Sequence, residues 1–176
     1  MHELSSVGGV SAGRVVGALV ACALLAGCAG FSDVKSGTPL KQVTGKYGRP
    51  AVSCQQPDGS RRMVWTQQPD GESAWAMSVS TDGLVGAPEQ VLTSAHFQVL
   101  ASGVWTPEKM RCEFGPPATI RDEGIAEKKQ WIWAYRFVQP GGFYALMYVY
   151  MGQDGNQMTQ YNAAPDPERS EEAMGH

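Results

Sequence analysis

The chain has 176 residues, of which 43% are hydrophobic and 18% are charged, and its formal net charge is −3. This length allows one ordinary domain or two very small ones. Residues 163–176 hold four acidic residues and one arginine, a charge of −3 on their own, so the rest of the chain is close to neutral. Near neutrality excludes a basic stripe for nucleic acid and a polybasic patch for anionic lipid.

Residues 1–27 have the layout of a secretory signal peptide. Arg14 precedes an apolar run at 15–26 that is shorter than the roughly 20 residues of a membrane span. The run ends in Leu-Ala-Gly-Cys at 25–28, which resembles the processing box of bacterial lipoproteins. The resemblance implies a diacylglycerol thioether and an amino-terminal acyl chain such as palmitate on Cys28. Residues 29 and 30 are Ala and Gly rather than the Asp of inner-membrane retention, which predicts a periplasm-facing outer-membrane lipoprotein.

Cys54 and Cys112 remain as an even pair in the exported chain, and paired thiols of an oxidising compartment usually form disulfides. A bond between them would stabilise the fold by roughly 3–4 kcal/mol in the chain-entropy model. The alternative is two unrelated buried thiols. A metal site is less favoured, because His96 is the only histidine between the two ends of the chain and no CxxC or HxxxH spacing occurs.

Two short helices are predicted from a pattern that occurs twice. Thr-Pro at 38–39 and at 106–107 supplies an N-cap followed by proline at the first helical position. Gly48 and Gly115 then end the helices, each with proline two residues further on. Apolar residues four apart lie between these signals in both copies, so each helix has one apolar face.

Each predicted helix precedes alternating segments that read as antiparallel strands. A Gln-Pro-containing turn follows the first segment of each copy, and Asp-Gly at 82–83 and 154–155 ends the second, which is a strong hairpin signal. Three or four strands per copy are therefore expected. The predicted strands span residues 62–67, 74–81 and 84–85 in the first copy, and 130–138, 143–152 and 157–161 in the second.

This order of glycine, threonine, short helix, Gly-x-Pro, Trp-bearing strand and Asp-Gly hairpin resembles the BamE (SmpA/OmlA) family of small outer-membrane lipoproteins. The tandem unit is also similar to the β-lactamase inhibitor protein fold. The resemblance covers residues 37–85 and 103–160, but it differs from a typical BamE in having two copies. It implies an α+β fold of two tandem repeats, each a short helix or helical hairpin packed on one face of a three- to four-stranded antiparallel sheet.

The predicted organisation follows from these boundaries. It comprises a signal peptide at 1–27, a lipid-anchored tether at 28–36, repeats at 37–92 and 93–162, and a disordered acidic tail at 163–176.

Alternation along the second strand of each repeat separates core from surface. Trp75, Met77 and Val79 form the inner set of the first repeat, and the Asp-Gly turns align them with residues 147, 149 and 151. The other face then has small residues in the first repeat and tyrosines in the second, which supply rigid contact area with a polar tip. We expect a partner-binding platform there, unless this face packs on the first repeat or under residues 86–102. Its candidate residues are Tyr144, Tyr148, Tyr150, Trp131 and Trp133.

Charged candidates favour ordinary structural roles. Asp122, Glu123 and Glu127 fall in a segment of mixed charge at 121–129, which predicts a solvated loop. His96 lacks a nucleophile in a recognisable setting, so a structural role is expected. The Arg-Arg pair at 61–62 is interpreted as a charged strand edge.

No catalytic, metal or cofactor site is therefore predicted, and we expect a protein that is not an enzyme. The expected function is a binding module that contacts another envelope protein and contributes to outer-membrane assembly or integrity, without nucleic acid or a small-molecule substrate. The alternative is an inhibitor of a periplasmic or secreted hydrolase, with the loop at 55–60 or 138–142 inserted into the cleft of the enzyme.

Overall fold

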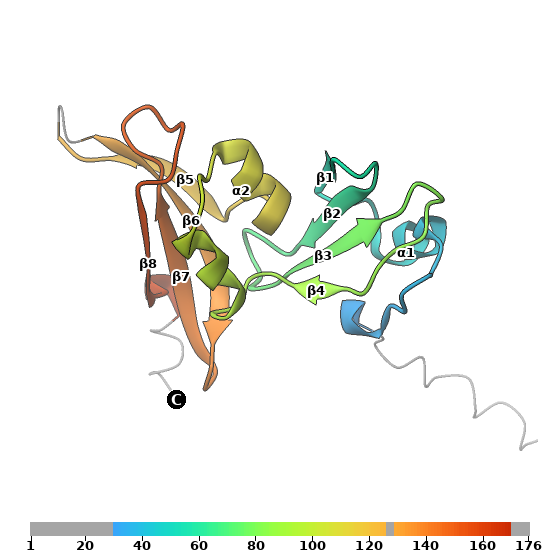
Figure 1. Cartoon of the computed structure of the whole chain (residues 1–176). Coiled ribbons are helices and arrows are strands. Elements are labelled where there is room, and N and C mark those ends of the chain that lie inside the picture. Colours follow the sequence, from blue (N-terminus) through green and yellow to red (C-terminus); the bar gives the residue numbers. More distant parts are fainter. Residues whose placement is uncertain (1–29, 126–128, 170–176) are drawn as a thin grey trace, which may run out of the picture.

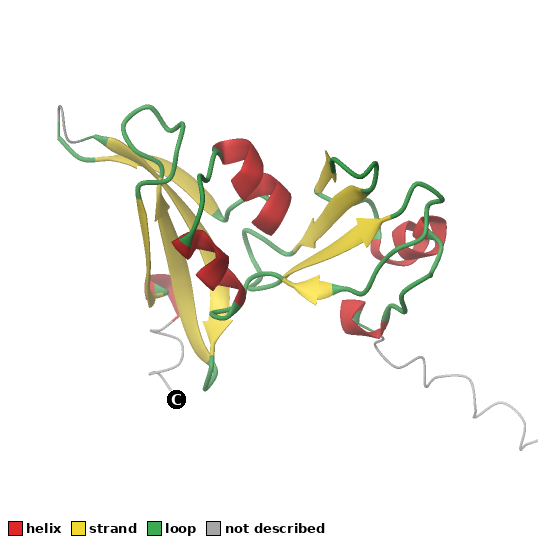
Figure 2. Ribbon diagram, viewed as in Figure 1, coloured by secondary structure: helices red, strands yellow, loops and turns green. Residues whose placement is uncertain are grey.

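The protein has an α+β fold with two four-stranded antiparallel sheets that follow one another along the chain (Figures 1 and 2). The computed structural model describes residues 30–125 and 129–169, so the predicted signal peptide and Cys28 lie outside the described residues. Strand order follows the sequence in both sheets, β1-β2-β3-β4 and β5-β6-β7-β8. The elements are η1 Phe31–Asp33, α1 Leu40–Tyr47, β1 Val52–Gln55, β2 Arg61–Thr66, β3 Ala74–Val79, β4 Glu89–Gln90, η2 His96–Ala101, α2 Pro107–Phe114, β5 Thr119–Glu123, β6 Gln130–Gln139, β7 Phe143–Tyr150 and β8 Gln160–Pro165.

The two predicted helices are present, but they begin differently. Thr106 caps α2 as predicted, because its side chain accepts a hydrogen bond from the Lys109 amide and Pro107 occupies the first turn. In α1 the N-cap is Pro39 without a side-chain cap, so the prediction for Thr38 is wrong. The Thr38 hydroxyl instead donates to the Lys35 carbonyl at 2.7 Å, which fixes the turn before the helix.

Both helices end at glycines in the same unusual conformation. Gly48 has φ 79° and ψ −173°, and Gly115 has φ 83° and ψ −172°, a region that is almost restricted to glycine. The predicted helix ends are thus confirmed.

Both edge strands of the first sheet, β1 and β4, differ from the prediction. β1 pairs with β2 over Val52–Gln55, where half-buried and exposed residues alternate and no residue is fully buried. The strand predicted at 84–85 is replaced by β4, opposite Trp75 and Ala76 of β3. Leu84 and Val85 each make only an isolated bridge, to Pro39 and Val79, so they do not extend the ladder.

In the second sheet the long central strands β6 and β7 occupy the predicted segments. The prediction for the segment that forms β5 is wrong. Asp122 and Glu123 were expected in a loop, but Thr119–Glu123 pairs with β6 in antiparallel register. All five residues of β5 are exposed because the strand lies at the edge of the sheet, so its sequence lacks an apolar pattern. Glu127 lies outside the described residues.

Both ends of the described chain are more ordered than predicted. In the segment expected to be a tether, the Phe31 ring stacks on Tyr47 at 4.1 Å, and the Tyr47 hydroxyl donates to the Gly30 carbonyl. In the segment expected to be a disordered tail, β8 continues to Pro165 and Asp166 is buried. The packed body therefore runs from Gly30 to Arg169, while residues 170–176 lie outside the description.

Helix α2 lies between the two sheets (Figure 1). It contacts β1, β2 and β3 of the first sheet, and Met110 and Phe114 share an apolar cluster with the inward side chains of β6 and β7. The predicted arrangement, in which each helix covers only its own sheet, therefore does not describe α2. The opposite face of the first sheet forms a second cluster of Val43, Met63, Trp65, Met77, Val79 and Val85.

Candidate partner-binding face and charged junction

The three candidate tyrosines lie on one face of the second sheet, as alternation predicted. Tyr144, Tyr148 and Tyr150 alternate along β7 with residues buried in the core, such as Met147 and Val149. Their neighbours on β6 are Val138, Ala134 and Ile132, respectively. We call this surface the tyrosine face, and α2 and η2 lie on the other side of the sheet (Figure 1).

The tyrosine face combines a covered centre with an accessible surface. Ile132 and Ala134 are buried at 4% and 2% exposure, whereas Tyr144 is 38% exposed and Tyr148 and Tyr150 are half-buried. The tyrosine rings thus present broad contact area above a closely packed apolar layer. Aromatic side chains of this kind carry much of the binding energy in protein interfaces.

Arginines flank the tyrosines. The guanidinium of Arg121 lies 5.8 Å from the Tyr148 ring centre, and that of Arg169 lies 5.7 Å from the Tyr144 ring centre. Arg136, in the middle of β6, pairs with Asp166 at 3.5 Å and also with Glu168. These contacts hold the rings and the C-terminal turn together at the rim of the face.

The two candidate tryptophans lie on the opposite face, so the prediction that they join the tyrosines is wrong. Trp133 pairs with Val149 in the ladder, is buried in the core and lies under the Arg111 guanidinium at 4.5 Å. Trp131 is 40% exposed at the start of β6, against the backbone of Gly155, where an added Cβ would lie 2.9 Å from its Cδ1. Odd-numbered residues of β6 face α2, which separates both rings from the tyrosine face.

The corresponding face of the first sheet is half covered. Ala74, Ala76 and Val64 are buried there in the cluster that contains α2. Ser78 at the end of β3 and Glu89 of β4 are the exposed residues on this face. The two sheets therefore use equivalent faces differently, one for internal packing and one for the surface.

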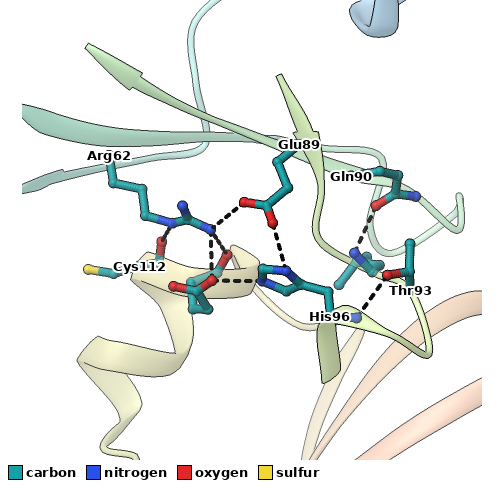
Figure 3. Close-up of polar contacts among 8 residues, drawn as sticks. Arg62, Glu89, Gln90, Thr93, His96 and Cys112 are labelled. Carbon is teal, nitrogen blue, oxygen red and sulfur yellow. Dashed lines mark hydrogen bonds and ion pairs between the residues drawn. The ribbon is translucent and has the colours of Figure 1, made fainter. Parts of the chain in front are cut away.

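A cluster of charged side chains lies where α2 meets the first sheet (Figure 3). His96 Nε2 is 2.7 Å from Glu113 Oε1, and His96 Nδ1 is 3.0 Å from Glu89 Oε1. Arg62 reaches the same Glu113 oxygen at 2.8 Å and donates from Nε to the Cys112 carbonyl at 3.1 Å. We call these four side chains, Arg62, Glu89, His96 and Glu113, the charged junction.

The neighbours of Glu113 favour its ionised form. Burial raises the pKa of this carboxyl, but the hydrogen bond with His96 and the positive charges of Arg62 and His96 outweigh burial, so the net shift of the pKa is downward. Glu113 is thus a carboxylate between the Arg62 guanidinium and the His96 ring at the end of α2.

The sequence interpretation of Arg62 and His96 was incomplete. Arg62 was assigned to a strand edge, but β2 lies between β1 and β3, and the side chain extends to α2. His96 has a structural position, as expected, yet it connects two carboxylates from different elements. The only available signal was Glu113 in the last turn of a predicted helix, which indicates no distant partner.

Two other predicted sites have simple geometry. Cys54 and Cys112 lie at disulfide distance, with Cα atoms 5.8 Å apart, and connect β1 to α2. Asp122 pairs with Lys129 and Glu123 with Arg121, so each carboxylate of β5 has a local basic partner.

Comparisons of the chain with protein-family models, curated proteins and solved structures gave no match. Within residues 30–125 and 129–169, no group of three or more acidic, histidine or cysteine side chains is arranged to hold a metal ion. In the same residues, no helix has both the length and the apolar character needed to cross a membrane.

Proposed function

We propose that this protein is a non-catalytic, lipid-anchored binding module of the outer membrane that contacts another envelope protein through its tyrosine face. The observation that carries the proposal is the pair of half-buried rings, Tyr148 and Tyr150, on the side of the second sheet away from α2. Its contribution would be to outer-membrane assembly or integrity, as the BamE-like order of helix and strands suggests.

The chemistry of the tyrosine face favours a protein as its partner. The three arginines near the tyrosines are each paired with a carboxylate: Arg121 with Glu123, Arg169 with Glu72, and Arg136 with Asp166 and Glu168. Among the described residues, these arginines therefore do not offer an unpaired positive charge to a phosphate group. The rings instead offer apolar area and hydroxyl groups in fixed positions. Such surfaces suit the side chains of a folded partner, because rigid rings lose little conformational entropy on binding.

The proposed lipid anchor on Cys28 would place the tyrosine face near the membrane. The packed body begins at Gly30, two residues after Cys28, and two residues span at most about 7 Å. A diacylglycerol on Cys28 would therefore hold the body close to the membrane rather than on a long tether. Confinement near the membrane raises the effective concentration of a partner located there.

Co-purification after mild crosslinking of intact cells tests the proposal. Wild-type protein is compared with the double variant Tyr148→Ser/Tyr150→Ser, and Ser78→Ala on the first sheet is the matched control. We expect a barrel-assembly or other outer-membrane protein to be captured by the wild type and the control and lost from the double variant. Capture that is unchanged in a folded double variant would contradict the proposal.

One exposed residue favours the inhibitor as a second candidate function. Phe143 is 68% exposed at the start of β7, directly after the loop at 138–142 that was considered for insertion into a hydrolase. In Figure 1 the β6–β7 hairpin extends below the rest of the second sheet. Capture of a hydrolase that is lost in Phe143→Ala but retained in Tyr148→Ser/Tyr150→Ser would support this candidate over the first.

A further inference from the structure

The contacts of His96 require an unusual distribution of protons. Both ring nitrogens face carboxylate oxygens, Nδ1 that of Glu89 and Nε2 that of Glu113. A neutral imidazole can donate from only one nitrogen, so its other lone pair would face a carboxylate oxygen. Both contacts are favourable together only when the ring is protonated, because the imidazolium donates from both nitrogens.

The surroundings of His96 contain charge of both signs. Glu113 on α2 and Glu89 beside β3 are the two acids, and Arg62 on β2 approaches both of them. Lys109 on α2 acts more distantly on Glu113, and the Phe114 ring contacts the imidazole edge-on at 5.6 Å. Two carboxylates and two cations, His96 included, form a balanced set at the junction itself (Figure 3).

We propose that protonated His96 is a pH-sensitive clasp that fastens β4 and the start of η2 to α2, and that loss of its proton releases β4. The two contacts differ in how firmly they are held. The Glu113 side chain is 24% exposed and also bound by Arg62, whereas Glu89 is 52% exposed and lies 3.8 Å from Arg62. When the ring becomes neutral it keeps Glu113 as its acceptor, and Glu89 turns into solvent.

β4 is suited to respond to this change. It consists of Glu89 and Gln90 alone, so a single lost contact affects a large part of the strand. The next residue, Val91, donates its amide to the Ala74 carbonyl at 2.9 Å. The exchange rate of this amide therefore reports whether the edge of the first sheet is closed or released.

The clasp has a limit at each end of the pH scale. Because the pKa of Glu113 is lowered, its contribution to stability is present above the ordinary glutamate range near pH 4.3 and is lost as the pH falls through the folded-state pKa. The contribution of the imidazolium is present while the ring carries both protons and is lost when the ring gives one up. The first sheet is therefore held most firmly while Glu113 is ionised and His96 is protonated.

The test uses the chain that begins after Cys28, which retains every member of both apolar clusters, since these start at Phe31. The ring nitrogens of His96 are observed by ¹⁵N NMR, with His176→Asn removing the other remaining histidine. At pH 7 we expect both nitrogens to have the shifts of an imidazolium. Shifts of a neutral tautomer at pH 7 would overturn the proposal.

Hydrogen exchange gives the functional readout, after correction for the intrinsic effect of pH. Between pH 6 and pH 8 we expect protection of the Val91 amide to fall about fivefold in the wild type, the effect of one lost ion pair. His96→Gln and Glu89→Gln should show no such fall, and the Met77 amide of β3 serves as the internal control. Equal pH dependence of Val91 protection in the wild type and both variants would also overturn the proposal.

Discussion

The two sheets of this protein have the same strand order, each preceded by an eight-residue helix, yet they differ in what lies on their equivalent faces. Ala76 in β3 is buried in the cluster that contains α2, while Tyr148 in the aligned position of β7 is half-buried on the surface. The placement of one helix thus decides which sheet retains a free face. The second sheet keeps the face that can meet a partner.

Side-chain size accounts for the difference. Ala74 and Ala76 leave room for a helix to approach the first sheet closely, and Phe114 fills the space between that sheet and the second. Tyrosines at the same places in the first sheet would keep α2 at a distance. The small residues of the first sheet allow α2 to pack there, and the tyrosines of the second sheet occupy the equivalent face that α2 does not cover.

The largest effect is expected where α2 joins the sheets. Phe114 is fully buried, and its ring lies 5.1 Å from that of Phe97 and 5.7 Å from that of Tyr135. Phe114→Ala should lower the free energy of unfolding by about 3–5 kcal/mol, through lost burial and a residual cavity. Urea denaturation followed by tryptophan fluorescence measures this change. A loss below about 1 kcal/mol would mean that α2 does not hold the sheets together.

Cys54 and Cys112 lie at disulfide distance between the same two regions, across a sequence separation of 58 residues. Replacing both with serine should reduce the free energy of unfolding by about 3–4 kcal/mol, because the unfolded chain gains conformational freedom. Denaturation of the double variant is compared with that of the oxidised wild type. The same stability in both would contradict a disulfide in the native protein.

The glycines that end α1 and α2 differ in how closely neighbouring side chains surround them. Gly48→Ala should cost about 1–2 kcal/mol, from backbone conformation alone, because its added Cβ has open space around it. Gly115→Ala has the same backbone strain and also places Cβ 3.2 Å from Cγ1 of Val64. Thermal denaturation should therefore show a larger loss for Gly115→Ala. Equal losses would indicate that α2 and β2 separate without cost.

The smallest effect on stability is expected on the tyrosine face. Tyr150→Ser removes a half-buried ring from the surface, so the free energy of unfolding should change by less than about 1 kcal/mol. Far-ultraviolet circular dichroism should remain that of the wild type while partner capture is lost. Unfolding of this variant would instead assign the ring to the core and remove the difference between the two sheets.

Much of this comparison could be predicted from local sequence signals. Proline and glycine marked both helices, and alternation placed Tyr148 and Tyr150 opposite Met147 and Val149. Alternation could also have placed Trp133 on the face opposite the tyrosines, since Trp133 pairs with Val149 in the ladder. That register depends on the β6–β7 turn, which the Gln-Pro-Gly-Gly segment alone does not fix to a single residue.

The remaining features depend on contacts that have no local signal. β5 lies at a sheet edge with all its side chains exposed, so its sequence resembles a solvated loop. The position of α2 between the sheets follows from the path of residues 86–106, and Arg62 meets Glu113 across a sequence separation of 51 residues. Such contacts are set by the assembled fold rather than by periodicity.

Site-specific photocrosslinking in living cells tests most directly whether the tyrosine face is the partner surface. A photoreactive amino acid is placed at Tyr150, and, as the matched position on the first sheet, at Ser78, which is also accessible. We predict a discrete adduct with one envelope protein from position 150 and none from position 78. The same adduct from both positions, or from position 78 alone, would contradict the account.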